Sequence, residues 1–314
     1  MALRIGTRAS ALAMTQAGTV AEMLGADLVP IVSEGDTSTA SLATLGGTGV
    51  FAKALRDALL RGDVDAVVHS FKDLPTAAEP GLVIAAVPPR VDARDALCAR
   101  DGMTLDELPE GARVGTGSPR RRAQLAMRRP DLDLVDIRGN IDTRLGRVGH
   151  EDPERALDAV ILAAAGLSRI GRLDAVTEMF DLDRWPTAPA QGALAVEVRA
   201  GDEHLVRRID HPESRAAADA ERGVLARLEA GCAAPIAAMS FVDDGLLFLT
   251  ARVYRPDGGE MIDSSRAMPL DTDAPAELAT LVGVDLIERG AARIAPLDPS
   301  TPAEADTPSP RRNP

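Results

Sequence analysis

The stretch Val114 to Pro130, VGTGSPRRRAQLAMRRP, gathers arginines in a chain whose formal net charge is −13. A strand-like run ends there in glycines, and Ser118 can cap a helix whose first turn holds Pro119, where a missing N–H costs nothing. The free amides of that turn, together with Arg120 and Arg121, form a site for a carboxylate or a phosphate. Because a guanidinium group matches a carboxylate in bidentate geometry, the stretch predicts a carboxylate site.

Two further strand-to-helix corners carry the same chemistry. In DIRGNIDTRLGR, Arg138 stands at a strand end, and Thr143 and Arg144 stand on the next helix. In RIGTRAS, Arg8 and Ser10 follow the opening strand. Ligands of open α/β sheets collect at the carboxyl ends of strands, so we expect these corners to share one ligand.

For any single arginine, a solvated helix face paired with a nearby aspartate remains an equal alternative. We assign Arg122, Arg128 and Arg129 to that structural class. The aspartates available for such pairs are Asp131, Asp133, Asp136 and Asp142.

A fourth corner, VVHSFKDLPT, brings Ser70, Lys72 and Asp73 out at the end of a buried-looking run. A carboxylate beside cations in a low dielectric can stabilise or exchange protons on a basic substrate nitrogen. The alternative for Asp73 is a turn residue before Pro75.

The two cysteines are judged separately, because a reducing compartment favours free thiols. Cys232 follows a helix in LEAGCAAPI, after a glycine suited to a left-handed cap. Cysteine is more often a small buried hydrophobe than a nucleophile, so Cys232 alone does not establish a function. Cys98 lies mid-strand in DALCAR and is expected in the core. The four histidines have no metal-ligand spacing.

Composition narrows the class of protein. The 314 residues suffice for two or three domains, and the 45% apolar and 26% charged contents are those of a soluble globular protein. With 2% aromatics and an acidic balance, neither a stacking site nor a nucleic-acid partner is favoured. We find no secretory signal pattern and no run of about 20 apolar residues, so the default location is the cytoplasm and no membrane contact is expected.

The elements that must hold these corners alternate between strands and helices. Strands at 3–7, 28–32 and 64–70 alternate with helices at 10–24 and 50–62, which predicts βα units on a largely parallel sheet. A second such set spans 112–166, and a strand within 185–199 could cross back to the first sheet. An antiparallel meander is expected over 236–268, with turns at Asp244-Gly245 and at PDGG. A helix within 275–294 would cover one of its faces.

The motifs also carry a resemblance. GTRAS, HSFKDLPT, VGTGSPRRRAQL, RGNIDTRL, LAAAGLSRIG, PAQGALAVE and LEAGCAAPI stand in this order along the chain. Together they make it similar to the porphobilinogen deaminase (hydroxymethylbilane synthase) family, from residue 3 to the final helix. The resemblance raises Cys232 and Asp73 well above what either motif supports alone.

The resemblance implies an enzyme that condenses four porphobilinogen molecules head to tail into hydroxymethylbilane, with loss of ammonia at each addition. It implies a dipyrromethane cofactor, joined by a thioether to Cys232, on which the chain grows. Each pyrrole brings an acetate and a propionate, so the arginines are expected to neutralise a growing polyanion. Porphobilinogen is then the substrate, uroporphyrinogen-III synthase a possible recipient of the product, and the protein a monomer in the cytoplasm.

The resemblance also implies roles for single residues. Asp73 is expected to be catalytic, contacting the pyrrole nitrogens and stabilising the positive charge that develops as ammonia leaves. The cofactor-binding residues expected beside Asp73 are Cys232, Ser10, Lys72, Thr116, Ser118, Arg120, Arg121 and Arg144. Those expected to bind substrate are Arg8, Gln16, Arg138, Arg169 and Gln191. No metal site is expected.

The implied fold class is α/β, with two periplasmic-binding-protein-like domains around a cleft and a small α+β C-terminal domain with an antiparallel sheet. The expected domains are 1–90 together with 188–208, then 91–187, then 209–296, followed by a disordered tail at 297–314.

Three residues depart from the family pattern: Thr48 replaces a common lysine, Gly117 a common serine and Pro119 a common aliphatic residue. Gly46, Gly47 and Gly49 suit a hinge or lid.

A non-catalytic binding protein for a small dicarboxylate is the competing hypothesis. It would use the same two-domain cleft and the same arginines, since a fold alone does not define a function. Such a protein has no use for Cys232, so the cysteine separates the two hypotheses.

Overall fold

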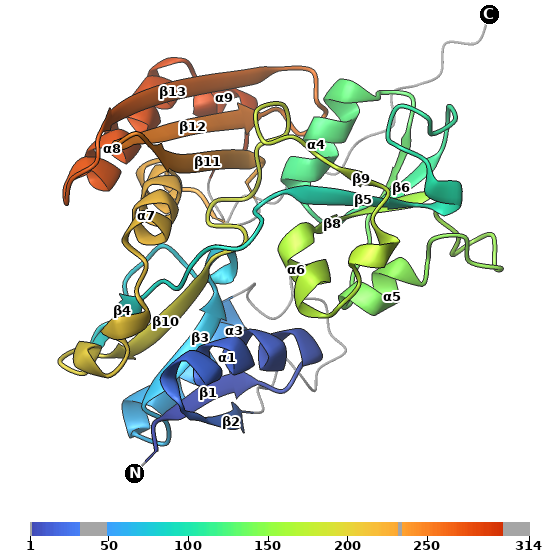
Figure 1. The fold of residues 1–314 in the computed structure, drawn as a ribbon. Helices are drawn as coiled ribbons and strands as arrows, with labels where there is room; N and C mark the ends of the chain where they lie inside the picture. The colour runs from blue at the N-terminus through green and yellow to red at the C-terminus, as the bar shows by residue number, and fades with distance from the viewer. Residues whose placement is uncertain (1, 32–48, 232–233, 298–314) are drawn as a thin grey trace, which may run out of the picture.

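The structure, a computed structural model, describes residues 2–31, 49–231 and 234–297, and these form three sheets (Figure 1). Its helices are α1 (Ala11–Leu24), α3 (Gly49–Arg61), α4 (Pro119–Arg128), α5 (Ile141–Leu145), α6 (Ala164–Arg169), α7 (Pro212–Arg227), α8 (Ala274–Glu288) and α9 (Ala291–Ile294). Short 3-10 turns are η1 (Phe71–Asp73), η2 (Arg100–Gly102), η3 (Leu173–Ala175), η4 (Glu203–Leu205) and η5 (Arg207–Ile209).

The first sheet has the order β2-β1-β3-β10-β4. Its strands are β1 (Arg4–Arg8), β2 (Asp27–Ile31), β3 (Ala66–Ser70), β4 (Leu82–Ala86) and β10 (Leu194–Arg199). The β1, β2 and β3 strands run parallel, as their alternation with helices predicts. The sheet is nevertheless mixed, because β10 returns from later in the chain and lies antiparallel between β3 and β4. The predicted return of the chain to the first sheet is thus confirmed.

The second sheet repeats this plan in the order β7-β6-β8-β5-β9. Its strands are β5 (Asp95–Ala99), β6 (Arg113–Gly115), β7 (Asp133–Val135), β8 (Ala159–Ala163) and β9 (Glu178–Met179). Here β6 pairs parallel with β7 and β8, and β5 lies antiparallel between β8 and β9. In each sheet the antiparallel strand is the one that the chain supplies by crossing from the other sheet, so two crossing segments join them.

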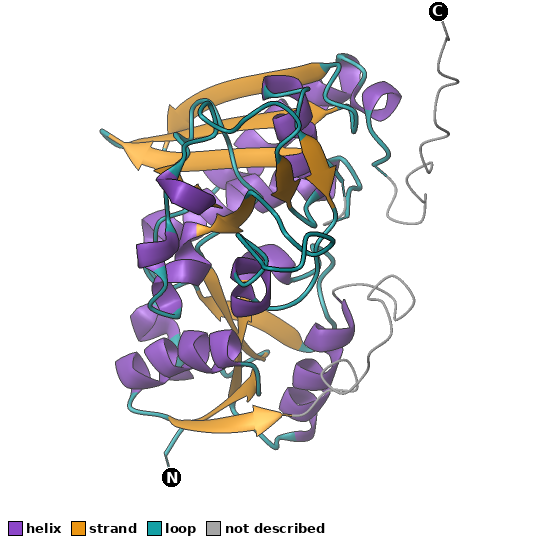
Figure 2. Ribbon diagram, turned by 90° about the vertical axis from the view of Figure 1, so that its right-hand side faces the viewer, coloured by secondary structure: helices purple, strands orange, loops and turns teal. Residues whose placement is uncertain are grey.

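The C-terminal sheet is the antiparallel meander that the turn signals predict. It consists of β11 (Ile236–Asp243), β12 (Leu246–Tyr254) and β13 (Met261–Pro269). Asp244 and Gly245 both adopt positive φ in the first turn, as a tight hairpin requires. Both α7 and α8 cover one face, where Val224, Leu249 and Val282 share a core. Figure 2 shows this sheet at the opposite end of the molecule from the first sheet.

One buried carboxylate ties the C-terminal sheet to both crossing segments. Glu221 of α7 is fully buried and accepts hydrogen bonds from Arg90 Nη1 at 2.6 Å and Nη2 at 3.0 Å. It also accepts from the backbone amides of Ala190, at 2.6 Å, and Ser240, at 2.8 Å. Since Arg90 and Ala190 lie in different crossings, Glu221 holds the three sheets at one point.

No helix among the described residues is both long and apolar enough to cross a membrane. Residues 298–314 of the predicted tail at 297–314 lie outside the described residues, as do Gly46, Gly47 and Thr48.

Candidate active site

Asp95 occupies the centre of the cationic cluster, at the start of β5. The side chain is fully buried, and each carboxylate oxygen accepts two hydrogen bonds. Oδ1 accepts from Arg121 Nη2 at 2.5 Å and from Gln191 Nε2 at 2.7 Å, and Oδ2 accepts from Arg120 Nη2 at 2.8 Å and from Trp185 Nε1 at 3.0 Å. Burial alone would raise the pKa of this carboxyl, but the two guanidinium charges hold the pKa well below its usual range.

The first turn of α4 presents both arginines because its N-terminus is built as the sequence predicts. Ser118 is the N-cap and accepts from the amide of Arg121, and Pro119 follows at the first helical position. Thr116 is buried, and its hydroxyl accepts from the amide of Ser118 at 3.2 Å. The turn therefore fixes Arg120 and Arg121 side by side over Asp95.

Lys72 joins the cluster from the first sheet. Its Nζ donates to Gln191 Oε1 at 3.1 Å, and the Gln191 amide nitrogen binds Asp95 and the carbonyl of Ala93. Burial, together with the charges of Arg121 and Arg120 and against the opposing effect of Asp73 and Asp95, lowers the pKa of Lys72 to about 8. The site therefore holds a lysine that titrates near neutral pH.

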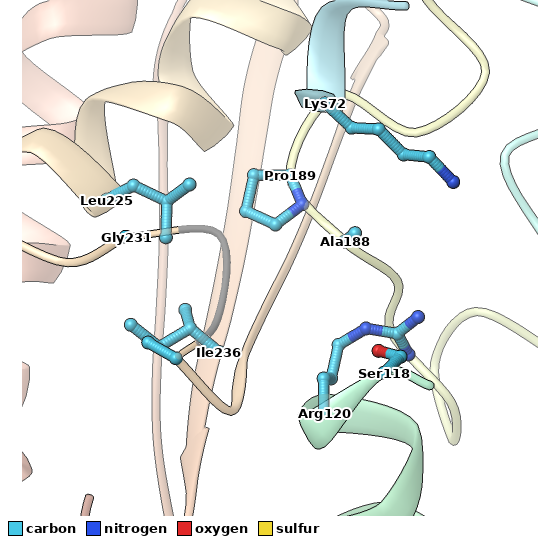
Figure 3. Close-up of a pocket in the computed structure, with 9 residues that line it drawn as sticks. Lys72, Ser118, Arg120, Ala188, Pro189, Leu225, Gly231 and Ile236 are labelled. Atoms are coloured by element: carbon cyan, nitrogen blue, oxygen red, sulfur yellow. The ribbon is translucent and has the colours of Figure 1, made fainter. Parts of the chain in front are cut away.

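A pocket opens beside this cluster (Figure 3). Lys72, Ser118 and Arg120 lie on one side of it, and Leu225, Gly231 and Ile236 lie on the other, with Ala188, Pro189 and Ala234 completing the wall. Gly231 and Ala234 are the described residues on either side of 232–233. Cys232 itself lies outside the described residues. The two chain positions that flank the cysteine thus line the same pocket as Lys72 and Arg120.

Asp73 is exposed at the end of η1, directly after Lys72. Its turn is fastened to α7 by Arg222, which donates to the carbonyls of Phe71 at 2.9 Å, Leu74 at 2.7 Å and Pro75 at 2.7 Å. The guanidinium also stacks 4.4 Å over the Phe71 ring. A buried arginine from the C-terminal part of the chain therefore sets the position of the Asp73 turn.

Two further arginines belong to the neighbouring elements: Arg144, in α5 at a predicted corner, and Arg169, at the end of α6. Arg144 donates to the carbonyl of Gly139 at 2.8 Å, and burial, Arg121 and Arg138 together lower its pKa. Arg169 donates to the carbonyl of Gly192 at 2.9 Å, and burial lowers its pKa to about 10. A nearby carboxylate stabilises the charged form of a guanidinium group in such surroundings, because burial alone disfavours that form.

Two family models cover most of the chain. Residues 3–207 match the porphobilinogen deaminase, dipyromethane cofactor binding domain, and residues 216–288 match the porphobilinogen deaminase, C-terminal domain. The chain belongs to the porphobilinogen deaminase family. The resemblance that the motifs carry is therefore confirmed, and so is the presence of a domain that binds the dipyrromethane cofactor.

Curated relatives in this family agree over nearly the whole chain. A porphobilinogen deaminase of Leifsonia xyli is 57% identical over 94% of this chain and 95% of its own length. That of Thermobifida fusca is 51% identical over 93% of this chain and 95% of its own length.

Solved structures are more distant. PG110 from Staphylococcus aureus matches 89% of this chain and 99% of its own at 11% identity, with a TM-score of 0.42. A Salmonella typhimurium periplasmic binding protein with high arginine specificity matches 66% of this chain and 89% of its own at 17% identity, with a TM-score of 0.33. Scores this low carry no argument, so the α/β class rests on the sheets themselves.

Four other residues suggested by the porphobilinogen deaminase motifs are not among the described residues that line this pocket. Ser10 caps α1 and is exposed, and Gln16 is buried in the same helix. Arg8 is half-buried at the end of β1. Arg138 is exposed, with its Nε 3.4 Å from Asp136. The structure brings Lys72, Ser118, Arg120, Arg121 and Gln191 together, and it does not show these four residues in that cluster.

Of the three arginines assigned to pairs with nearby aspartates, Arg129 meets one of the expected partners, whereas Arg128 and Arg122 do not. Arg122 donates to the carbonyl of Leu134, Arg128 pairs with Asp106, and Arg129 pairs with Asp131 at 2.6 Å. Cys98 is buried in the core of the second sheet, as predicted, and burial raises its pKa to about 11.

Sequence reasoning missed Asp95. The signal was a single charged residue at the start of the otherwise apolar strand DALCA, a place where burying an unpaired carboxylate is costly in free energy.

The structure also explains one departure from the family pattern. A Cβ on Gly117 would lie 2.6 Å from the carbonyl oxygen of Ile137, so the serine common at this position requires a shift of that backbone.

Proposed function

We propose that this protein is a hydroxymethylbilane synthase, a transferase that condenses four porphobilinogen molecules into hydroxymethylbilane and releases ammonia at each addition. The primer is a dipyrromethane attached through a thioether to Cys232. The family membership and the match to a dipyrromethane cofactor binding domain support this reaction.

The observation that supports the proposal most directly is which residues line the pocket. Gly231 and Ala234, which flank the cysteine position, line the same pocket as Lys72, Ser118 and Arg120. A pyrrole unit joined to Cys232 would therefore present its acetate and propionate groups to these cations. When bound, the dipyrromethane supplies a covalently held pyrrole end to which the next pyrrole is added.

The residues fit a polyacidic group. Arg120 and Arg121 share one carboxylate, Asp95, so the pair keeps one positive charge in a buried place. The Nε of each guanidinium is buried and has no hydrogen-bond partner among the residues that the structure describes. An unsatisfied buried donor beside excess positive charge favours a carboxylate ligand.

The neighbours of Asp73 support its role as the catalytic carboxylate. It directly follows Lys72, which lines the pocket, and its charge influences both Lys72 and Arg144. Its role is to stabilise positive charge at the pyrrole nitrogens as ammonia leaves, an electrostatic task that a fixed carboxylate performs well.

Around this centre, two groups of residues bind carboxylates. The cofactor is held by Ser10, Lys72, Thr116, Ser118, Arg120, Arg121 and Arg144. The substrate is held by Arg8, Gln16, Arg138, Arg169 and Gln191.

The proposal extends to the oligomeric state, location, product recipient and domains of the enzyme. The protein acts as a monomer in the cytoplasm, and uroporphyrinogen-III synthase takes up the product. Its domains are 1–90 with 188–208, 91–187, and 209–296, a division that the membership of β10 in the first sheet supports.

Ammonia release tests the proposal against a non-catalytic dicarboxylate binder. Purified protein incubated with porphobilinogen should release one ammonia per porphobilinogen consumed, and Cys232→Ser should release none. A binder keeps its ligand affinity in Cys232→Ser, and neither form releases ammonia. That second result would reject the proposed reaction.

A further inference from the structure

We propose that Asp95 is a positioning residue, whose buried carboxylate holds the guanidinium groups of Arg120 and Arg121 in the geometry that binds the pyrrole carboxylates. The inference rests on the proposed function of the pocket. It assigns to Asp95 a purpose beyond folding, because the carboxylate sets the affinity of the site without touching the ligand.

The hydrogen-bond pattern around Asp95 leaves no freedom to the two arginines. Each carboxylate oxygen accepts one guanidinium and one neutral donor, the Trp185 indole or the Gln191 amide. The neutral donors come from the segment that leads back to β10, so the carboxylate is held from outside α4. Both guanidiniums are therefore fixed to the second sheet and its crossing segment rather than to the helix alone.

The remaining contacts of the arginines hold the same geometry. Arg121 Nη1 donates to the carbonyl of Ile161 at 3.0 Å. Arg120 Nη1 donates to Gln124 Oε1 at 2.5 Å, and Gln124 Nε2 donates to the hydroxyl of Tyr254 at 3.2 Å. Since Tyr254 belongs to β12, the C-terminal sheet also contributes to the position of Arg120.

Charge explains why one carboxylate serves two arginines. Two guanidiniums buried together without a counterion would repel each other at a large desolvation cost. A carboxylate for each would cancel their attraction for a ligand. A single shared carboxylate makes the burial tolerable and leaves one net positive charge for the carboxylates of the bound pyrroles.

Positioning and plain electrostatics predict opposite results for Asp95→Asn. Removing the negative charge makes the site more positive, so electrostatics alone predicts tighter binding of carboxylates. Loss of the shared anchor releases both guanidiniums, so positioning predicts weaker binding. We expect the KM for porphobilinogen to rise about tenfold, the scale of one charged hydrogen bond, with a smaller change in kcat.

The decisive variant is Asp95→Glu, because it keeps the counterion and moves the carboxylate by one methylene. Its KM should also rise several-fold. In both variants, the fraction of protein molecules that carry the two-pyrrole unit should be lower than in wild type. It is measured by intact mass on folded protein isolated by gel filtration.

Trp185 is the one tryptophan of the sequence, so a shift of its fluorescence emission reports that the indole N–H has lost its partner.

Asp131→Asn is the matched control. Asp131 pairs with Arg129 at 2.6 Å just after the other end of α4, away from the pocket. The Asp131→Asn variant should keep the wild-type KM, pyrrole content and tryptophan emission.

If neither Asp95 variant is recovered folded, Trp185→Phe tests the inference, since it removes one hydrogen-bond donor to Asp95 and keeps an aromatic ring. A KM rise of about threefold then supports the inference, and an unchanged KM contradicts it.

Wild-type KM and pyrrole content in Asp95→Glu, or tighter binding in Asp95→Asn, would overturn the inference and leave the proposed function intact. A wild-type protein with no pyrrole unit and no turnover would instead reject the proposed function. The two failures are therefore distinguishable.

Discussion

Lys72 and Asp95 are joined through a single side chain, that of Gln191. The Gln191 amide oxygen accepts from Lys72 Nζ at 3.1 Å, and its nitrogen donates to Asp95 Oδ1 at 2.7 Å. Lys72 follows the end of β3, Asp95 begins β5, and Gln191 lies in the segment that returns to β10. The link therefore couples a titrating lysine of the first sheet to the arginine pair of the second.

The pKa of Lys72, lowered to about 8 mainly by burial, predicts a pH dependence of the binding of pyrrole carboxylates. Bound carboxylates favour the charged lysine, so above pH 8 binding must take up a proton. We expect kcat/KM to fall as the pH rises through about 8, by up to about tenfold per pH unit. The profile should be measured from pH 7 to 9.5.

Lys72→Arg is the control, because a guanidinium stays charged over this whole range. Titration of the substrate amine affects both proteins equally, so the difference between the two profiles belongs to Lys72. Identical profiles for the two proteins would show that Lys72 does not titrate in the free enzyme.

Asp73→Asn should separate catalysis from cofactor attachment. Asp73 is exposed in η1 and makes no contribution to a buried core, so the variant should fold and carry its pyrrole unit. Turnover should fall by roughly 10² or more, the scale of a lost electrostatic or acid–base group. Single-turnover ammonia release measures this directly. Retained turnover would assign the role to another residue.

Glu221→Ala should strongly destabilise the fold. The substitution leaves Arg90 without its partner and removes the acceptor of the Ala190 and Ser240 amides. Breaking such a buried ion pair costs about 3–5 kcal/mol of unfolding free energy. Urea unfolding followed by circular dichroism measures the loss. Glu213→Ala, an exposed change in the first turn of the same helix, should cost less than about 0.5 kcal/mol.

Gly258→Ala tests the contact between the β12–β13 turn and α4. A Cβ at Gly258 would lie 2.5 Å from the Met127 amide nitrogen and 2.8 Å from the Ala126 side chain. Gly245 has almost the same φ, +74° against +75°, but no atom of the described part of the chain lies within 4 Å of its Cβ position. Gly258→Ala should therefore cost about 1–3 kcal/mol more than Gly245→Ala in urea unfolding. Equal costs would mean that only backbone strain matters at Gly258.

Local signals in the sequence were enough to predict the corners of the site. The Ser118 cap, Pro119 and the antiparallel meander follow from short-range stereochemistry, and each is placed as expected. The pair of Arg129 with Asp131 also follows from local charge spacing, whereas Arg128 pairs with Asp106, 22 residues away along the chain.

Long-range contacts were the part that the sequence could not supply. Asp95 lies 25 residues from Arg120 along the chain and 96 from Gln191, so no local pattern marks it as their partner. Glu221 is 131 residues from Arg90. The mixed pairing of the first sheet has the same origin, because β10 reaches its place from a distant part of the chain.

The intact mass of the purified protein tests the central claim most directly. Wild type should exceed the mass of its polypeptide by one dipyrromethane unit. Cys232→Ala should show no increment, while Cys98→Ala, which changes the buried cysteine of the second sheet, should keep it. A fully active wild-type protein at the bare polypeptide mass would contradict the account.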